Sequence, residues 1–423
     1  MWILDRNNGS LNHCTGTRKS RHHHQLEITR RIMSPLRITL FLVFIAYGSS
    51  HIATAQKVAA SPLATVGMTT RPFTDESRKN WQSTVPRPLN TVIWYPSATS
   101  SPTAPFVANA ENTQFFGDPS LGKFFTEIPV AYDAPLLPSA KKRPLILLSH
   151  GATSLGLSLM WLGDFLAQHG YIVAAVNHHG NTAAGDQILA QGFALVWERP
   201  EDLTAVLTKL LADPVFGNQI DPNRIGAVGH SADGANVVQL AGGIYDSDAL
   251  IAFCNSPESQ GDATCEPRDL IKQAIAHIAE LKTTDPVLQE SFRHEKESHR
   301  DPRVRVFAMT PAIGPGFTQR NLAPIHIPVQ VVVGDADDTA PPTTTAAHYA
   351  KLIKRAKLTI LPHVGHSTFG SECNLLGEKA LPSCHDAPDV DRTVIHAQED
   401  QQVLTFFEGV WHQNQQRSSP WNR

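Results

Sequence analysis

The stretch "RIGAVGHSADGANVVQLAGG", residues 224–243, decides the fold. Its first half is an apolar run of strand type, its second half has the apolar spacing of a helix, and Ser231 stands between them. The stretch nearly matches the strand–turn–helix pattern G-x-S-x-G, but Asp233 occupies the place of the second glycine. Gly229 keeps the strand side of the turn free of a side chain, and we expect Gly234 to do part of this on the helix side. The stretch predicts a modified turn rather than a broken one, with the Asp233 side chain pointing outward from the first helical turn.

Apolar segments of strand type alternate with amphipathic segments from about residue 143 onward. Strands that are apolar on both faces and alternate with helices are typical of a parallel sheet covered by helices on both sides. The sequence therefore predicts an α/β fold with a mostly parallel, doubly wound sheet. The predicted strands are "RPLILLSHG", "YIVAAVNHHG", "RIGAVGHS", "RVRVFAMT", "IPVQVVVGDAD" and "KLTILPHVGH". The predicted helices are "LMWLGDFLAQHG", "RPEDLTAVLTKLLADP" and the closing "RTVIHAQEDQQVLTFFEGVW".

Two segments stand outside this alternation. "LNTVIWYP", residues 89–96, alternates apolar and polar residues and predicts an early antiparallel strand. Residues 245–302 form a long insertion that includes the amphipathic segment "EPRDLIKQAIAHIAELK". An insertion of this size near the carboxyl end of a strand predicts a helical lid over a cleft, although a helix pair on the surface fits the pattern equally well.

The first 55 residues have the features of a leader and signal peptide. The apolar run "ITLFLVFIAY" follows Arg37, and the small-x-small pattern "ATA" ends at Ala55, where we expect cleavage. The run is shorter than the ~20 residues that span a bilayer, so we expect no stable membrane anchor. A start at Met33 is an open alternative. The sequence thus predicts a secreted or periplasmic protein whose mature domain spans residues 56–423.

Charge and composition narrow the class of partner. The formal net charge is -3, the sequence pI is about 6.7, and 41% of the residues are hydrophobic. Such a balance gives no general attraction toward nucleic acids or anionic membranes. A small neutral or amphipathic substrate fits better.

Four cysteines lie outside the leader, at positions 254, 265, 373 and 384. Four cysteines in an exported protein favour two disulfides, and three pairings are possible. We favour the pairing that closes two short loops, Cys254 with Cys265 and Cys373 with Cys384, because it needs no long-range contact. Free, buried thiols are the alternative.

Three of the predicted strands end in reactive side chains. Ser231 follows one strand, an acidic loop with Asp337 follows another, and His366 follows the last. The carboxyl ends of parallel strands share one edge of the sheet, where ligands bind. The order serine, acid, histidine is that of the α/β-hydrolase triad. These residues are therefore predicted as nucleophile, orienting acid and general base.

Neighbouring residues decide between candidates in the same loops. Asp337 is favoured because a Pro-Pro pair turns the loop four residues later, whereas Asp335 and Asp338 are expected to be cap or loop residues. His366 is favoured as the base because a glycine precedes it, whereas His363 still belongs to the strand end and is expected to be structural.

An acyl-transfer intermediate also needs donors for its oxyanion. The backbone N–H groups of Ala152, in "LLSHGATS", and of Ala232, directly after the serine, are predicted to supply them. His150 is expected to shape the first of these loops rather than to react.

Other motifs do not support a cofactor or a metal. "GATSLGLS" has Leu157 where a phosphate loop requires lysine, and "HEKESH" is one residue too long for H-E-x-x-H. The pair His178 and His179 could bind a metal, but a loop lining the cleft is the better interpretation. We therefore predict no cofactor and no metal.

From about Val66 to its end, the chain resembles the secreted group called predicted dienelactone hydrolases. This group is similar to platelet-activating-factor acetylhydrolases and more distantly to cutinase-like polyesterases. The matching segments are "RPLNTVIWYP", "PLILLSHG", "LAQHGYIVAAVNHHGNT", "RPEDLTAVL", "IDPNRIGAVGHSADGANVVQLAG", "IPVQVVVGDADDTAPP", "LPHVGHSTF" and the run from Cys373 to His396.

The resemblance implies an α/β-hydrolase fold and a serine esterase. It implies the triad Ser231, Asp337 and His366, with Ala152 and Ala232 as oxyanion donors. The chain departs from the family at Asp233, where a glycine is usual. In acetylhydrolases the acid can follow the preceding strand, but that strand ends here in "FAMTPA" without a carboxylate, which favours Asp337. Dienelactone hydrolases proper use a cysteine nucleophile, so the group's name says little about the substrate.

The leading hypothesis is hydrolysis of carboxylic esters, with short acyl chains or lipid-like groups, through an acyl-serine intermediate. An amidase or peptidase could use the same residues. A non-catalytic binding protein on a hydrolase scaffold would be expected to lack a triad residue, and this chain lacks none.

Overall fold

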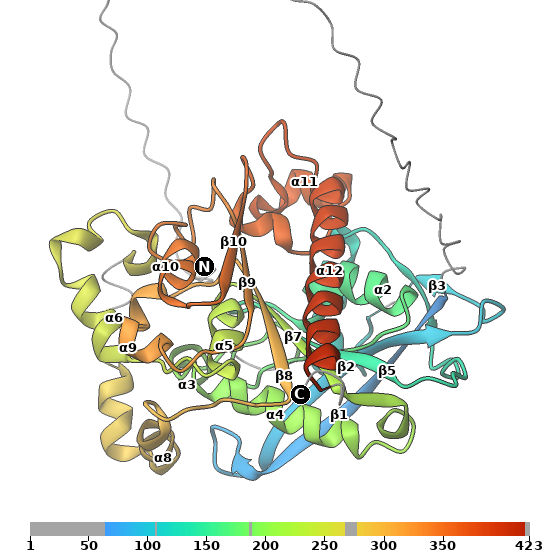
Figure 1. Ribbon diagram of the computed structural model, residues 1–423, viewed down its shortest axis with the longest axis horizontal. Helices are drawn as coiled ribbons and strands as arrows, with labels where there is room; N and C mark the ends of the chain where they lie inside the picture. Colours follow the sequence, from blue (N-terminus) through green and yellow to red (C-terminus); the bar gives the residue numbers. More distant parts are fainter. Residues whose placement is uncertain (1–63, 106–107, 186–187, 267–276, 419–423) are drawn as a thin grey trace, which may run out of the picture. The chain divides into compact units, whose positions relative to one another are not determined.

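The computed structural model describes residues 64–105, 108–185, 188–266 and 277–418 (Figure 1). They belong to one unit, Pro62–Arg423. The leader and its predicted cleavage site lie outside the described residues, as do residues 267–276 of the predicted amphipathic segment in the insertion. Within the described part of the chain, we find no helix with the length and apolar character needed to cross a membrane.

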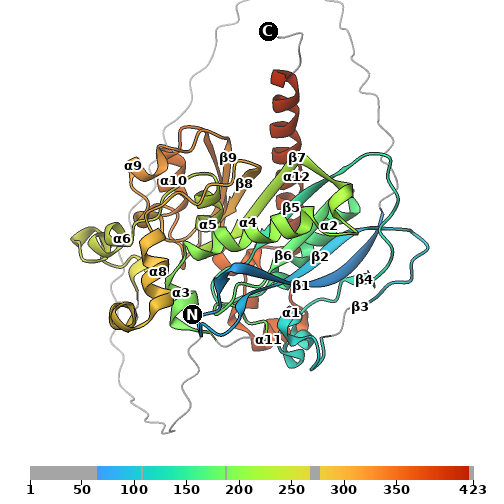
Figure 2. The ribbon, with the colours of Figure 1, turned by 90° about the horizontal axis from the view of Figure 1, so that it is seen from below.

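One mixed sheet of ten strands organises these residues, in the order β10-β9-β8-β7-β5-β6-β2-β1-β4-β3 (Figure 2). Neighbouring strands from β10 to β6 are parallel, whereas β2 pairs antiparallel with both β6 and β1. The strands are β1 (Thr65–Lys79), β2 (Pro86–Ser97), β3 (Ala104–Pro105), β4 (Pro129–Tyr132), β5 (Arg143–Ser149), β6 (Ile172–Val176), β7 (Ile220–His230), β8 (Val304–Met309), β9 (Val329–Gly334) and β10 (Ala356–Leu361). The prediction of a mostly parallel α/β sheet is confirmed.

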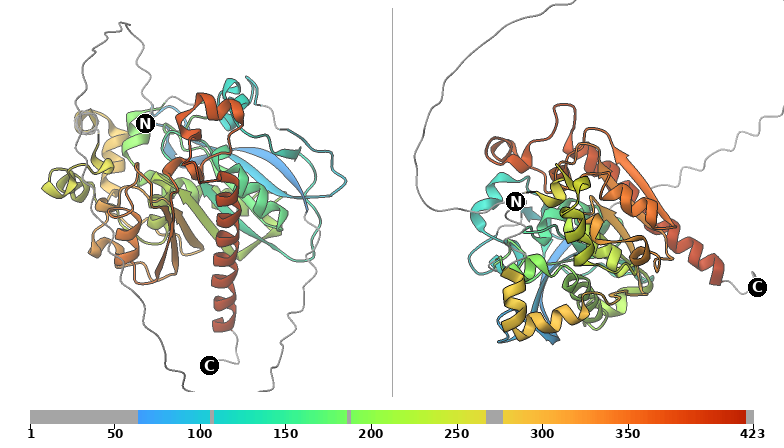
Figure 3. Two further views of the ribbon diagram at one scale, coloured as in Figure 1. Left: turned by 90° about the horizontal axis from the view of Figure 1, so that it is seen from above. Right: turned by 90° about the vertical axis from the view of Figure 1, so that its left-hand side faces the viewer.

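Helices cover both faces of the sheet (Figures 1 and 3). The α-helices are α1 (Thr113–Phe116), α2 (Met160–Gln168), α3 (Ala190–Ala194), α4 (Glu198–Leu211), α5 (Ala232–Leu240), α6 (Ser247–Cys254), α8 (Pro286–His294), α9 (Gln319–Leu322), α10 (Ala346–Leu352), α11 (Leu375–Ala380) and α12 (Arg392–Ser418). Short 3-10 helices include η1 (Pro119–Phe124), η6 (Gly314–Gly316) and η7 (His366–Phe369). The predicted helices therefore correspond to α2, α4, α5 and α12.

Each buried strand contributes to two hydrophobic cores. In β5, Leu145 and Leu147 pack into the core that contains side chains of α4 and α5, whereas Ile146 and Leu148 pack into the core that contains side chains of α2 and α12. Successive side chains of a strand point to opposite faces, so a strand covered on both sides must be apolar throughout. This is the physical reason for the continuous apolar run "RPLILLS".

Two disulfides close short loops. Cys254 bonds Cys265 at the end of α6, and Cys373 bonds Cys384 around α11. Each bridge spans 11 positions of sequence, and the Cα atoms lie 5.4 Å and 5.8 Å apart. The predicted sequence-local pairing is confirmed.

The insertion of residues 245–302 contains α6 and α8, and residues 277–284 are also helical. Two contacts join the insertion to the rest of the unit. Helix α6 packs against η6, and the indole N–H of Trp197, at the start of α4, donates a hydrogen bond to Ser291 of α8. In Figure 2, α8 lies beside α3 and α4. A role of this insertion as a lid remains a prediction.

Candidate active site

Ser231 occupies a sharp turn between β7 and α5. Its φ of 59° is positive, which is a strained conformation for a residue other than glycine. Three backbone hydrogen bonds hold the turn: Ser231 N–H donates to Met309 O over 3.0 Å, and its carbonyl oxygen accepts from Gly234 and Ala312. The turn thus exposes the serine hydroxyl at the carboxyl edge of the sheet, on a backbone that neighbouring segments fix.

The close approach of strand and helix requires glycine at two positions. A Cβ atom added to Gly229 would lie 2.0 Å from the carbonyl oxygen of Asp233. One added to Gly234 would lie 2.7 Å from Cα of Pro311, beyond the end of β8. Gly234 therefore meets the steric demand on the helix side, as predicted, and position 233 itself has room for a side chain.

The predicted orientation of Asp233 is wrong, because its side chain points inward and is fully buried. Its carboxylate pairs with the Arg199 guanidinium of α4 and accepts a hydrogen bond from the Asn236 amide. Since the first turn of α5 packs against α4, the carboxylate meets a buried cation there instead of solvent. The ion pair with Arg199 stabilises the Asp233 carboxylate more than the interaction with the helix dipole that the sequence suggested.

The structure brings Ser231, His366 and Asp337 into one hydrogen-bonded series. The His366 Nδ1–H donates to Asp337 Oδ2 over 2.8 Å, and the Ser231 hydroxyl donates to His366 Nε2 over 2.9 Å. These tautomers follow from the partners, because a carboxylate can only accept. Asp337 is buried, and its other oxygen accepts the backbone N–H groups of Thr339 and Ala340. The carboxylate is therefore fixed toward the imidazole.

The alternative candidates lie elsewhere. Asp335 accepts the backbone N–H of His363, and Asp338 is exposed and accepts from the Thr339 hydroxyl. The His363 ring is exposed and pairs with Asp389, and this pairing raises its pKa. Among the residues that the structure describes, none of these three forms a hydrogen bond with Ser231 or His366, which is consistent with cap, loop and structural roles.

Ala152 and Ala232 flank the serine on two sides. Ala232 is the first residue of α5, and a Cβ atom added to Gly151, next to Ala152, would lie 3.0 Å from Ser231 Cβ. Within the ranges that the structure describes, neither alanine N–H donates a hydrogen bond to a protein acceptor. N–H groups without protein acceptors at these two positions are compatible with the predicted oxyanion site.

Two buried histidines surround the serine. Burial and the neighbouring His366 lower the pKa of His230 to about 3, so this ring is neutral. Burial, His178 and Arg199 lower the pKa of His150 well below its usual range. The neutral His150 ring donates from Nδ1 to its neighbour Gly151 O over 2.8 Å, which agrees with the predicted role in shaping that loop.

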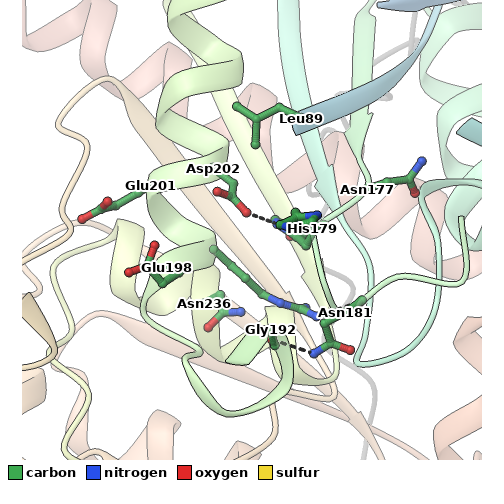
Figure 4. Close-up of polar contacts among 12 residues, drawn as sticks. Leu89, Asn177, His179, Asn181, Gly192, Glu198, Glu201, Asp202 and Asn236 are labelled. Carbon is green, nitrogen blue, oxygen red and sulfur yellow. Dashed lines mark hydrogen bonds and ion pairs between the residues drawn. The ribbon is translucent and has the colours of Figure 1, made fainter. Parts of the chain in front are cut away.

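A buried polar network behind the serine was not predicted from the sequence. Asp202 pairs with Arg87 and Arg78 and accepts from His178 Nδ1, and the other nitrogen of His178 lies 2.8 Å from the Ser149 hydroxyl. Figure 4 shows Asp202 pointing toward the loop that carries Asn177, His179 and Asn181. The only signal in the sequence is the charged start of the amphipathic segment "RPEDLTAVL". Among the described residues, no group of three or more His, Cys, Asp or Glu side chains could hold a metal ion.

Comparison with known proteins agrees with this architecture. The profile of the Alpha/beta hydrolase family matches residues 145–373, which is more than half of the chain. The chain belongs to the alpha/beta hydrolase family. The matched region begins in β5 and ends after η7, so it includes the serine turn, the acidic loop and His366.

The individual proteins that this chain is similar to are distant. The chain is similar to Cutinase est1 of Thermobifida alba, with 28% identity over 34% of this chain and 45% of the cutinase. It is also similar to Platelet-activating factor acetylhydrolase of Cavia porcellus, with 27% identity over 35% of this chain and 45% of that protein. The chain thus matches less than half of the length of these curated relatives. A solved ferulic acid esterase from Streptomyces cinnamoneus shares the fold, with a TM-score of 0.55, 20% identity, and coverage of 86% of this chain and 94% of that chain.

Proposed function

We propose that this hydrolase is a serine esterase that cleaves carboxylic esters through an acyl-serine intermediate. The observation that carries the proposal is the hydrogen-bonded series from Ser231 through His366 to the buried Asp337. A serine hydroxyl is a weak nucleophile, and it becomes reactive when a base can take its proton during attack. The cutinase and acetylhydrolase relatives support an ester as the substrate.

The geometry supports a proposed role for each group. As Ser231 Oγ attacks the ester carbonyl, His366 Nε2 takes the hydroxyl proton, and Asp337 stabilises the imidazolium that results. The backbone N–H groups of Ala152 and Ala232 stabilise the oxyanion of the tetrahedral intermediate. The imidazolium then gives its proton to the leaving alcohol, and a water activated by the same nitrogen releases the acid and regenerates the serine.

We further propose that the substrates carry short acyl chains or lipid-like groups, as the resemblance to acetylhydrolases and cutinase-like enzymes implies. The mature domain would span residues 56–423, with residues 245–302 as a lid. The two disulfides support export, because such bonds persist in oxidising compartments. Membership of the group called predicted dienelactone hydrolases is part of this proposal.

The test is hydrolysis of p-nitrophenyl esters from acetate to decanoate, compared between the wild-type protein, Ser231→Ala and Asp337→Asn. We expect Ser231→Ala to abolish turnover and labelling by a fluorophosphonate, with the label on the wild type mapped to Ser231 by mass spectrometry. We expect Asp337→Asn to lower kcat by about 10⁴-fold, since the amide no longer orients the imidazole with its charge. A matched p-nitroanilide series separates esterase from amidase activity. A folded wild-type protein that neither hydrolyses esters nor takes the label would refute the proposal and favour a binding protein on a hydrolase scaffold.

A further inference from the structure

Arg199, at the start of α4, joins three segments around the serine. Its side chain is 2% exposed. One terminal nitrogen, Nη1, pairs with Asp233 of α5 and also donates to His150 O over 3.2 Å. The other, Nη2, donates to Asn181 O over 3.2 Å. One guanidinium thus binds the first turn after the serine and the two loops that follow β5 and β6.

These contacts reach the backbone on both sides of Ala152. On one side, Arg199 binds the carbonyl oxygen of His150 directly. On the other, the Asn181 side-chain oxygen accepts the N–H of Thr153 over 2.7 Å, while Arg199 binds the Asn181 backbone oxygen. Thr153 has a positive φ of 59°, so this turn needs such support.

The same loop contains the peptide that carries the Ala152 N–H. The carbonyl oxygen of that peptide belongs to Gly151 and accepts from His150 Nδ1 over 2.8 Å. In a trans peptide, the C=O and N–H groups point in opposite directions. Fixing the Gly151 oxygen therefore fixes the direction of the Ala152 N–H, and the position of His150 depends in turn on Arg199. In Figure 4, the Asn181 side chain also bonds Gly192 of α3, which anchors the second loop.

We propose that Arg199, held by Asp233, is a positioning residue for the oxyanion site: it fixes the loop that aims the Ala152 N–H at the reacting carbonyl. This inference rests on the proposed esterase function. It also gives Asp233 a role in place of the usual glycine. An arginine buried at this point needs a counter-charge, and Asp233 supplies it from the helix that starts at the nucleophile.

The experiment compares a paired variant with a matched control. The paired variant Arg199→Met with Asp233→Asn removes both charges and leaves no unpaired buried ion. A second variant, Arg199→Lys, keeps the positive charge but lacks the two terminal nitrogens of the guanidinium. The control is Arg87→Met. The Arg87 side chain is also 2% exposed and pairs with a buried aspartate, Asp202, but within the described part of the chain it forms no hydrogen bond or ion pair with residues 150–153. Asp202 retains Arg78 as a partner in that control.

Two readouts separate positioning from folding. The first is kcat and KM for p-nitrophenyl acetate. The second is the inhibition constant of an alkyl trifluoromethyl ketone, whose carbonyl carbon bonds the serine oxygen while its own oxygen becomes the oxyanion and the hydroxyl proton passes to His366. Loss of one oxyanion donor lowers kcat by ~10²–10³-fold, and here the donor is displaced rather than removed. We therefore expect kcat/KM to fall about 10- to 100-fold in both Arg199 variants, with ketone affinity falling in the same proportion and KM nearly unchanged.

The control should lose thermal stability but keep kcat/KM within about twofold of wild type. If the folded Arg199 variants keep wild-type kcat/KM and ketone affinity, the positioning role is refuted while the esterase stands. The same holds if they lose activity only to the extent that Arg87→Met does. If the wild-type protein itself neither hydrolyses esters nor binds the ketone, the proposed esterase function is refuted. This outcome differs from a wild type that is active and Arg199 variants that are equally active, which refutes only the positioning role.

Discussion

The buried carboxyl of Glu399 should make this protein less stable in alkaline solution, and Glu399→Gln should remove this residue's share of the loss. Glu399 lies on α12 and is fully buried. One carboxyl oxygen accepts from Gln402 over 2.7 Å, and the other has no partner within the described part of the chain. Burial raises the pKa of Glu399 from 4.5 to about 8. The folded protein therefore keeps this proton up to a pH at which the unfolded chain has lost it.

The sign and the magnitude follow from proton linkage. A carboxyl whose pKa is higher in the folded state contributes stability that is fully present below the unfolded pKa and is lost as the pH rises through the folded pKa. Each pH unit between the two pKa values lowers the unfolding free energy by about 1.4 kcal/mol. From about pH 5 to about pH 9, the wild type should lose roughly 4 kcal/mol of unfolding free energy through Glu399, and the total loss of Glu399→Gln should be smaller by that amount.

The assay is guanidinium unfolding followed by tryptophan fluorescence at a series of pH values between those limits. Exposed Glu111→Gln is the matched control, because it removes a carboxylate that stays in water. Its unfolding free energy should follow the wild type at every pH. The difference between Glu399→Gln and wild type should grow with pH. Equal pH dependence of wild type and Glu399→Gln would refute the reasoning that this carboxyl is protonated in the folded state.

Two further changes test the turn and one disulfide. Gly229→Ala places a Cβ atom against the Asp233 carbonyl oxygen, so we expect a loss of about 1–3 kcal/mol in unfolding free energy together with a fall in ester hydrolysis. Gly409→Ala, where an added Cβ meets nothing within 4 Å, is its control, and equal effects of both changes would contradict the steric argument. The paired change Cys373→Ser with Cys384→Ser should lower unfolding free energy by about 3 kcal/mol, measured by guanidinium unfolding. An unchanged midpoint would show that this loop does not need the bridge.

Periodicity made most of the sheet predictable. The apolar runs of β5 and β7 are continuous because each strand faces two cores, and a sequence displays this property directly. The early strand β2 pairs antiparallel with both of its neighbours, as expected, but residues 91–97 are buried without alternation because this strand also faces two cores. The 3-10 helices and the short strands β3 and β4 could not be predicted, since their few residues carry no period.

The residues of the candidate site were also visible in the sequence, because chain order places the ends of parallel strands at one edge. That rule brings the loops of Ser231, Asp337 and His366 together without any knowledge of side-chain contacts. The choice of Asp337 over Asp335 depended on turn geometry alone. In the structure, the backbone N–H groups of Thr339 and Ala340 hold the Asp337 carboxylate, whereas Asp335 holds the backbone of the neighbouring loop.

The orientation of the Asp233 side chain could not be predicted from the sequence. A residue in the first turn of a helix is assigned to solvent or to the core by its local pattern, but its partner here is Arg199, 34 positions earlier on another helix. The steric demand of the turn lies at Gly229 and Gly234, whose missing Cβ atoms would strike backbone on either side. Position 233 faces the start of α4 instead, where a side chain fits if its charge is matched. A departure from the G-x-S-x-G pattern at this position therefore leaves the turn intact, and its consequence depends on whether α4 offers a cation to meet it.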